Sequence, residues 1–530
     1  MPNVVPRAIP ALIPGGGPQS LTALTEYGRA LAPHRDAIIS RHRRLTFAQL
    51  DDEVRRAAGV LRSLGVAPGD RVAASLGNHV ELVVAFLAVQ RLGAIWVGIN
   101  TSAAPSEKEW VLNHCGATLL IADDAGAATT PDGGSARRVI DAEPSRPDSE
   151  WAISIAAAEP AGAGPTDPFA PAAIAYTSGT TGRPKGVVHG QHNMLLPGAA
   201  IDFTEPDPDG RMGVCLPLTI LNLMILGPIA TLQFGRPCVL MDRRDSVGIA
   251  EWVKRESITT FAAVPTMIHD LLTNPMIDQA DLASLRRPGV GGGNCPDSFK
   301  ELYERRFGVR VTVGYGLTEA PTVVTRERAT SPVILGSCGR PLPQFEVTIR
   351  NDAGDVLAGE ESGEICVAQS REGPFAGVYT PMLGYWNADP SVGSPVRDGV
   401  LYTGDIGHLG PDGDLFVTDR KNDLIIRGGA NVYPAEVEAV LRADVRVAQC
   451  CVLGLEDERL GERVVAAVVV ADRAEVDISG LIADLTVACA GRLASYKVPD
   501  QIVIADALPC NAMGKVLKRE VAALFRDVIQ

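Results

Sequence analysis

The residues best suited to chemistry form a decapeptide at positions 177–186, Thr177, Ser178, Gly179, Thr180, Thr181, Gly182, Arg183, Pro184, Lys185 and Gly186. Glycines carry no Cβ, so backbone N–H groups can turn towards a ligand at close range. The hydroxyls add donors and Lys185 adds a full positive charge, which suits a polyphosphate anion. The spacing is not that of a Walker loop. A plain surface loop is the alternative, but strand-like runs at 174–176 and 187–188 flank the decapeptide and favour a phosphate cradle.

A second cluster, residues 314–319, has the sequence GYGLTE. Its aromatic ring, Tyr315, can stack on a purine, and the hydroxyl of Thr318 can hydrogen-bond to phosphate. The carboxylate of Glu319 can hold Mg²⁺ against phosphate oxygens. The alternative is a simple turn with a solvated acid. The phosphate-type loop upstream favours the functional interpretation.

Length and charge restrict the class of protein. A chain of 530 residues is too long for one compact core, and three or four domain-sized units are typical of that length. The net charge of −14 argues against nucleic acid or an anionic membrane as a partner. The ten cysteines show no metal-binding spacing and fit a reducing compartment, so we expect a cytoplasmic protein.

Two stretches raise the questions of export and membrane insertion. Residues 1–19 are rich in Pro and Gly and have no signal-peptide pattern, so we do not expect export. The uncharged run 212–235 is long enough to cross a membrane, but Pro217, Gly227 and Pro228 interrupt it. We therefore predict that this run is buried core beside a site, with no integral membrane association.

Alternating helices and strands must position these motifs. Apolar spacing predicts helices at 47–64, 81–92, 246–256 and 297–307, and strands at 71–75, 94–97, 118–122, 237–241, 259–264 and 309–313. This alternation predicts parallel α/β layers. From about residue 336 the sequence pattern changes to that of short strands separated by Gly/Pro turns, which indicates a β-rich subdomain. The last segment again mixes helices with strands.

The decapeptide resembles the phosphate loop of the adenylate-forming superfamily, which contains acyl- and aryl-CoA synthetases, adenylation domains of peptide synthetases and beetle luciferases. The resemblance extends over nearly the whole chain. It implies an α/β fold with a large N-terminal part of two stacked α/β sheets and a β-barrel subdomain, followed by a small mobile α+β C-terminal domain. We expect a flexible N-terminus at 1–20, an N-terminal adenylation domain at 21–421 with the β-rich subdomain at about 336–421, and a C-terminal domain at 422–530.

The resemblance also implies a nucleotide site. Asp405 would take the ribose hydroxyls and Arg420 the ribose or phosphate, while residues 291–293 resemble the adenine-contacting turn, with glycine at position 293 where alanine is usual. Mg²⁺ would bind Glu319 and Thr180. The implied ATP- and AMP-binding set is Thr177, Ser178, Gly179, Thr180, Thr181, Gly182, Lys185, Gly291, Gly292, Gly293, Gly314, Tyr315, Gly316, Thr318, Asp405, Arg420 and Lys515.

Three further matches concern catalysis and the second substrate. Lys515 matches the catalytic lysine, and with Thr318 and Glu319 it forms the implied catalytic set. It would offset the charge that builds up when a carboxylate attacks the α-phosphate and pyrophosphate leaves. Gly428 and Gly429 match the family loop that lines the tunnel for the pantetheine arm of coenzyme A. Asn422 occupies the hinge position, where Asp or Lys is usual.

The acid itself is restricted by residues 217–224, PLTILNLM. Ile220 replaces the family's gating histidine or aromatic residue, and Leu221 stands where amino-acid-activating relatives carry an aspartate. An ammonium buried without a counter-charge would cost several kcal/mol. With Gly314 and Gly316, these residues predict a pocket for an apolar alicyclic, aromatic or medium-chain acid.

Three functions stay open from sequence alone. The first is an acid–CoA ligase that uses ATP, Mg²⁺ and coenzyme A; the second is a stand-alone adenylation enzyme that loads a separate carrier protein. The third is a nucleotide-binding protein without catalysis, which would not need Lys515. Consumption of coenzyme A separates the first two, and pyrophosphate release separates both from the third. The expected partners are a small carboxylic acid, ATP and coenzyme A, with no nucleic acid and with a homodimer left open.

Overall fold

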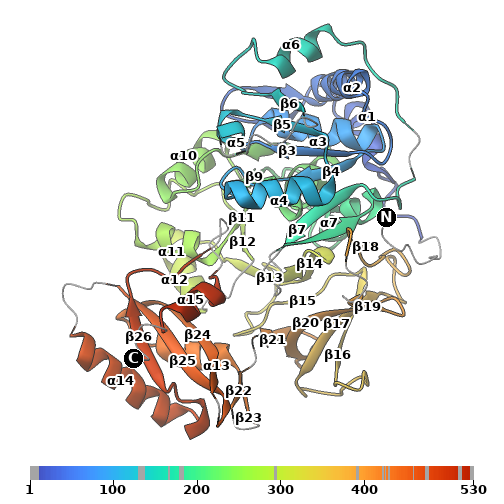
Figure 1. Ribbon diagram of the computed structural model, residues 1–530. Coiled ribbons are helices and arrows are strands. Elements are labelled where there is room, and N and C mark those ends of the chain that lie inside the picture. The colour runs from blue at the N-terminus through green and yellow to red at the C-terminus, as the bar shows by residue number, and fades with distance from the viewer. Residues whose placement is uncertain are drawn as a thin grey trace. The chain divides into compact units, whose positions relative to one another are not determined.

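The computed structural model describes residues 11–128, 130, 138–164, 167–177, 184–291, 295, 297–388, 393–420, 423, 425–427, 430–457, 459–471, 477–510 and 516–525. Its internal contacts fall into two compact units. Unit 1 comprises Met1–Thr348, Cys366–Thr403 and Asp412–Leu415, and unit 2 comprises Ile349–Ile365, Gly404–Pro411 and Phe416–Gln530. Figure 1 labels many of the helices and strands. The domain boundaries inferred from the sequence stay predictions.

The larger sheet of unit 1 has nine strands in the described part of the chain, in the order β15-β14-β13-β12-β11-β9-β10-β1-β2. Neighbours from β13 to β1 run parallel, and β14, β15 and β2 are antiparallel. The strands are β1 (Asp36–Ile39), β2 (Arg44–Thr46), β9 (Met212–Val214), β10 (Cys238–Leu240), β11 (Thr260–Ala263), β12 (Arg287–Val290), β13 (Thr312–Leu317), β14 (Ala320–Arg326) and β15 (Arg340–Pro341). Helices α10 (Ser246–Glu256), α11 (Pro265–Thr273) and α12 (Asp297–Phe307) contribute to its core, which includes Trp252, Phe261 and Tyr303.

The second sheet of unit 1 has seven described strands in the order β18-β8-β7-β4-β3-β5-β6. They are β3 (Arg71–Ser75), β4 (Ile95–Gly98), β5 (Leu119–Ala122), β6 (Arg138–Asp141), β7 (Ala173–Thr177), β8 (Lys185–His189) and β18 (Gly384–Tyr385). Helix α2 (Phe47–Ser63) contacts β1 and β2 of the nine-stranded sheet. It also contacts α3 (Val80–Arg91), which packs on β4 (Figure 1). A helical layer therefore joins the two sheets, and the predicted α/β fold class is confirmed.

The β-rich part has five described strands, ordered β16-β17-β20-β19 with β21 paired to β20. They are β16 (Phe345–Arg350), β17 (Gly363–Gln369), β19 (Val396–Arg397), β20 (Val400–Leu409) and β21 (Leu415–Arg420). A further five described strands form the sheet of the C-terminal part: β22 (Ile425–Arg427), β23 (Ala430–Val432), β24 (Val447–Asp457), β25 (Gly461–Val470) and β26 (Gln501–Ala505). Helices α13 (Pro434–Arg442) and α14 (Ile478–Arg492) share its core, and α15 (Lys518–Ala523) packs against β24.

The uncharged run 212–235 folds as β9 followed by a short helical stretch. That stretch consists of α8 (Leu221–Met224), the π-helical turn η2 (Ile225–Ile229) and α9 (Ala230–Leu232), and most of its apolar side chains are buried. Among the described residues, no helix is long and apolar enough to cross a membrane. The prediction of buried core is confirmed, and η2 packs against β14 and β9.

Candidate active site

The predicted phosphate loop connects two antiparallel strands. Strand β7 ends at Thr177, β8 begins at Lys185, and these two residues face each other in the ladder. Of the predicted loop residues, Ser178, Gly179, Thr180, Thr181 and Gly182 lie outside the described residues. Thr177 and Lys185 are therefore the two ends from which the loop departs.

The GYGLTE motif forms a second hairpin. The sequence predicted a strand at 309–313, but β13 continues through Gly314, Tyr315 and Gly316 because these residues lie along the antiparallel strand β14. A Cβ at Gly316 would lie 1.8 Å from the carbonyl oxygen of Thr322, so a side chain there is excluded. Leu317 pairs with Ala320, which places Thr318 and Glu319 in the turn.

The two hairpins are joined by hydrogen bonds. Nε2 of His189, at the end of β8, lies 2.7 Å from the carbonyl oxygen of Thr318. Because a carbonyl oxygen only accepts, Nε2 must be the protonated nitrogen of this buried ring. The Tyr385 hydroxyl donates to Oε1 of Glu319 at 3.1 Å, and the Nζ of Lys185 lies 5.2 Å from the centre of the Tyr385 ring. The structure thus brings Lys185, Thr318 and Glu319 together.

Tyr385 and His189 were not found from the sequence. Tyr385 lies in the two-residue strand β18, which no local pattern indicates, and it pairs opposite Val187 of β8. Burial, followed by the charge of Glu319, raises the pKa of Tyr385 well above its ordinary value. The phenol is therefore neutral near pH 7 and donates a hydrogen bond to the carboxylate.

The predicted adenine turn begins beside the GYGLTE strand. Strands β12 and β13 run parallel, with Val290 opposite Val313, so Gly291 comes beside Gly314. A Cβ at Gly291 would meet only the Gly314 carbonyl oxygen, at 3.8 Å. This leaves a flat backbone surface at the carboxyl ends of the strands, where ligands bind in open α/β sheets. Gly292 and Gly293 lie outside the described residues.

The predicted acyl-pocket segment is anchored by Asn78, another residue that the sequence did not indicate. Its Nδ2 donates to the carbonyl oxygens of Val214, Leu216 and Met241 at 3.1, 3.0 and 3.2 Å. Its Oδ1 accepts from the backbone N–H of Leu218 at 3.0 Å. One amide therefore fixes the backbone that leads into Ile220 and Leu221. Ile220 precedes α8, and Leu221, its first residue, is buried.

Substituting Asn78 with alanine should destabilise unit 1. Three carbonyl oxygens and one N–H, all in part-buried hydrogen bonds, would lose their partner at once, and an unsatisfied buried group costs about 1–3 kcal/mol. We expect a loss of roughly 3 kcal/mol in the free energy of unfolding, measured by urea denaturation. Asn351→Ala, in an exposed turn, is the control and should change stability far less. Equal midpoints for both variants would contradict this account.

Unit 2 contains the predicted ribose-binding pair. The Nε of Arg420, at the end of β21, lies 3.1 Å from Oδ1 of Asp405 in β20. Asp405 is buried, with 7% of its side chain exposed, whereas the Arg420 side chain is 52% exposed. The carboxylate is therefore held in place by a cation that also faces solvent.

In the same unit, Lys518 of α15 pairs with Asp423 at 3.1 Å. Asn422, Gly428, Gly429 and Lys515 lie outside the described residues.

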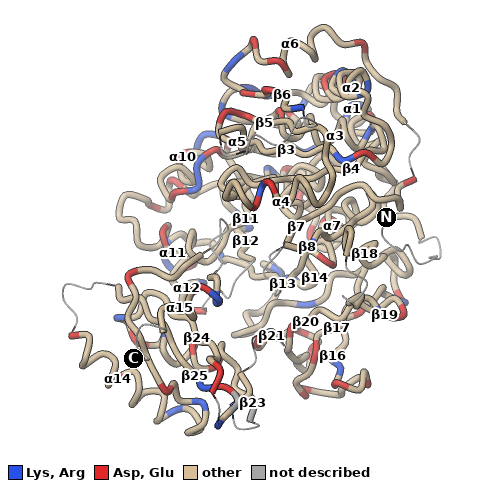
Figure 2. Tube along the Cα trace, in the orientation of Figure 1, with Lys and Arg blue, Asp and Glu red and all other residues tan. Residues whose placement is uncertain are grey.

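Of the two residues predicted to hold Mg²⁺, the structure describes Glu319, and Thr180 lies outside the described residues. No cluster of three or more His, Cys, Asp or Glu side chains in the described ranges could hold a metal ion. Figure 2 shows acidic and basic residues interspersed along the trace. A single carboxylate fits Mg²⁺, which is commonly held by one or two carboxylates together with substrate phosphates. Glu319, in the turn beside Lys185, meets that description.

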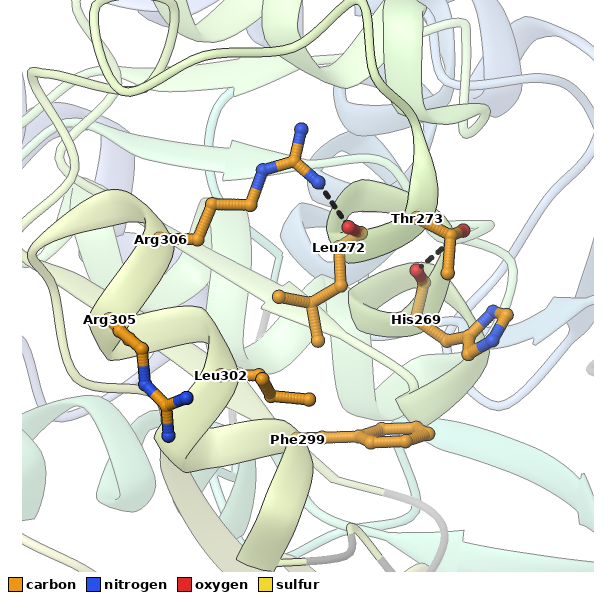
Figure 3. Close-up of a pocket in the computed structure, with 7 residues that line it drawn as sticks. All are labelled: His269, Leu272, Thr273, Phe299, Leu302, Arg305 and Arg306. Atoms are coloured by element: carbon orange, nitrogen blue, oxygen red, sulfur yellow. Dashed lines mark hydrogen bonds between the residues drawn. The ribbon is translucent and has the colours of Figure 1, made fainter. Parts of the chain in front are cut away.

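A groove elsewhere in unit 1 lies between α11 and α12 (Figure 3). Phe299, Leu302 and Leu272 form its apolar wall, and Arg306 donates to the carbonyl oxygen of Leu272. None of the residues predicted to bind nucleotide or acid lines it. We therefore give this groove no part in the reaction.

Comparisons with known proteins identify the family of the chain. A family model described as AMP-binding enzyme matches residues 28–386, and one described as AMP-binding enzyme C-terminal domain matches residues 436–515. A feruloyl-CoA synthase of Amycolatopsis sp is 33% identical, covering 93% of this chain and 97% of the relative. A 2-succinylbenzoate–CoA ligase of Geobacillus kaustophilus is 34% identical, covering 93% and 96%. The structure of o-succinylbenzoate CoA synthetase from Bacillus subtilis with its acyl-adenylate intermediate has a TM-score of 0.80 at 31% identity, covering 94% of this chain and 97% of that one.

Proposed function

The chain belongs to the family of AMP-binding enzymes, and on that premise we propose that it is an AMP-forming acid–CoA ligase. One observation of the structure carries the proposal. The hairpin at the base of the phosphate loop and the turn that bears Glu319 are held together, because the Tyr385 hydroxyl donates to Oε1 of Glu319 and the Lys185 ammonium lies 5.2 Å from the centre of the same ring. A cation and a carboxylate placed at a glycine-rich loop suit ATP with its metal ion.

The proposed reaction has two steps. A carboxylate oxygen of the acid attacks the α-phosphorus of ATP, the bond to pyrophosphate breaks, and an acyl-adenylate forms. The thiolate of coenzyme A then attacks the acyl carbonyl carbon, AMP leaves with its electron pair, and a thioester results. In the first step negative charge moves onto phosphate oxygens, and Lys515 would offset it. Mg²⁺, when bound, would neutralise phosphate charge; Glu319 and Thr180 would hold it.

The remaining predicted residues take supporting roles in this proposal. Tyr315 would stack on the adenine, whose edge would meet the backbone at Gly291, and Thr318 would hydrogen-bond to phosphate. Asp405 would accept hydrogen bonds from the ribose hydroxyls, and Arg420 would contact ribose or phosphate. The pantetheine arm would pass Gly428 and Gly429, with Asn422 as the hinge.

We propose an apolar acid as substrate. Leu221 is buried and uncharged where an amino-acid substrate would need a carboxylate, and Ile220, Gly314 and Gly316 add no charge. The names of the two relatives above, feruloyl-CoA synthase and 2-succinylbenzoate–CoA ligase, each contain an aromatic group and coenzyme A. These names favour coenzyme A over a carrier protein as acceptor. A cytoplasmic location and a homodimer stay predictions.

The test is pyrophosphate release from ATP with a panel of acids, each with and without coenzyme A. We expect aromatic, alicyclic and medium-chain acids to support turnover. Coenzyme A should accelerate this turnover, because its thiol converts the bound acyl-adenylate to the thioester and frees the site. Amino acids and short dicarboxylates should give little release. Release that stops after one equivalent despite coenzyme A would contradict the proposed acceptor, and release with amino acids alone would contradict the proposed acid.

Asp405→Asn should weaken ATP binding. The amide keeps the shape of the carboxylate but loses its charge, and hydrogen bonds to charged groups contribute about 1.5–3 kcal/mol. We therefore expect the KM for ATP to rise by about tenfold to a hundredfold, with a smaller change in the KM for coenzyme A. Asp412→Asn, in the exposed turn between β20 and β21, is the matched control. Equal KM values for ATP in the two variants would contradict the proposed role of Asp405 in binding ATP.

A further inference from the structure

Tyr385 has its backbone fixed directly beside the phosphate-loop hairpin. In β18, Gly384 pairs with Val188 and Tyr385 with Val187 of β8. The flanking residues add backbone hydrogen bonds, from Leu383 N–H to Val188 at 2.9 Å and from Trp386 N–H to the Gly186 carbonyl at 2.7 Å. The Tyr385 side chain therefore has a defined origin next to Lys185.

The phenol has a different charged neighbour at its hydroxyl and at its ring. The hydroxyl donates to Oε1 of Glu319 at 3.1 Å. The ring has the Lys185 ammonium 5.2 Å from its centre, within the range of a cation–π contact. No hydrogen bond from the described residues reaches Oε2 of Glu319, and a carboxylate has about four lone-pair sites. The phenol thus occupies one lone-pair site of the Glu319 carboxylate, and the remaining lone-pair sites can accept from, or coordinate, another group.

Lys185 and Glu319 carry opposite charges and both meet Tyr385, yet no ion pair joins them within the described structure. An ammonium and a carboxylate that meet the same tyrosine attract each other, and they can pair where no other contact holds them. Such a pair would satisfy the lysine that should meet phosphate and the carboxylate that should meet the metal ion. Tyr385 instead meets each charge with a different part of its side chain, the ammonium with the ring and the carboxylate with the hydroxyl, and both charges stay available to a ligand.

We propose that Tyr385 is a positioning residue: its hydroxyl orients the Glu319 carboxylate towards the divalent cation that accompanies ATP, and its ring keeps Lys185 from pairing with Glu319. This inference rests on the proposed function. It concerns binding of the metal ion and nucleotide, before any chemistry, so it can be tested without turnover.

The experiment titrates the full-length protein with Mn²⁺ in the presence of ATP and follows free Mn²⁺ by electron paramagnetic resonance. ATP binding without metal is measured separately by calorimetry. Tyr385→Phe keeps the ring and loses the hydroxyl, so we expect the Mn²⁺ dissociation constant to rise about fivefold, with metal-free ATP binding unchanged. Tyr385→Ala loses both functions, so we expect both affinities to fall. Tyr27→Phe, in α1 (Leu24–Leu31), is the matched control because its hydroxyl bonds to no described residue, and it should match wild type.

The outcomes separate the two proposals. Wild-type affinity for Mn²⁺ in Tyr385→Phe would overturn the positioning role while leaving nucleotide binding intact. An equal loss of metal and metal-free ATP binding in that variant would also overturn it, because a general structural defect would explain the loss. If wild-type protein bound no Mn²⁺ with ATP, the proposed function would fail together with this inference. Should Tyr385→Ala not fold, the Tyr385→Phe result alone decides.

Discussion

Replacing Lys515 with alanine should lower pyrophosphate release by about a hundredfold to a thousandfold. Removing one group that stabilises charge in the transition state costs about 2.7–4 kcal/mol in enzymes where it has been tested. In the proposed first step this charge appears on the phosphate oxygens as the carboxylate attacks. Lys515 would be the cation that meets it, and no neutral side chain at that position could do so.

The second half-reaction should be affected far less. When the acyl-adenylate is supplied directly, the thiol attacks a carbonyl carbon and no new bond to phosphorus forms or breaks. We expect thioester formation from supplied adenylate to stay within a few-fold of wild type. Lys254→Ala removes an exposed lysine that pairs with Asp281, and it is the control for loss of a positive charge. Full pyrophosphate release in Lys515→Ala would refute the assignment of this lysine.

Replacing Glu319 with glutamine should lower pyrophosphate release by at least about tenfold at low Mg²⁺. Glutamine keeps an oxygen that can accept the proton of Tyr385, so the turn between β13 and β14 should persist. What is lost is the negative charge, and Mg²⁺ prefers hard, charged oxygen ligands. Raising the Mg²⁺ concentration should therefore restore part of the rate.

The measurement is the initial rate of release across a series of Mg²⁺ concentrations at saturating ATP. Glu304→Gln, on the exposed side of α12, provides the matched change of charge away from the site. The half-saturating Mg²⁺ concentration should rise in Glu319→Gln and stay constant in Glu304→Gln. Identical Mg²⁺ curves for both variants would mean that Glu319 does not hold the metal ion.

The sequence predicted the alternation of helices and strands because the spacing of apolar residues differs between a helix and a strand and can be read within each element. The strands on both sides of the phosphate loop were recognised in this way. The extent of β13 was not: glycine is disfavoured in strands, so the prediction ended at residue 313. Cross-strand pairing with β14 and the 1.8 Å approach at Gly316 explain why the strand continues.

The site was predictable where residues are contiguous and not where distant segments meet. The GYGLTE motif places Thr318 and Glu319 next to each other, so one stretch of sequence indicated both. Their partners, His189 and Tyr385, are 129 and 66 residues away along the chain. Asn78 lies 140 residues before the Leu218 that it anchors. Such pairs leave no local pattern in a single sequence, because their spacing is set by the topology of the sheets.

The most direct test of the account follows an oxygen atom from the acid. An accepted acid is labelled with ¹⁸O in its carboxylate, incubated with ATP, Mg²⁺ and coenzyme A, and the products are analysed by mass spectrometry. If the carboxylate attacks the α-phosphorus and coenzyme A then displaces AMP, each AMP must carry one ¹⁸O and the acyl group must appear as a CoA thioester. Unlabelled AMP, or label in inorganic phosphate with formation of ADP, would contradict the adenylate route.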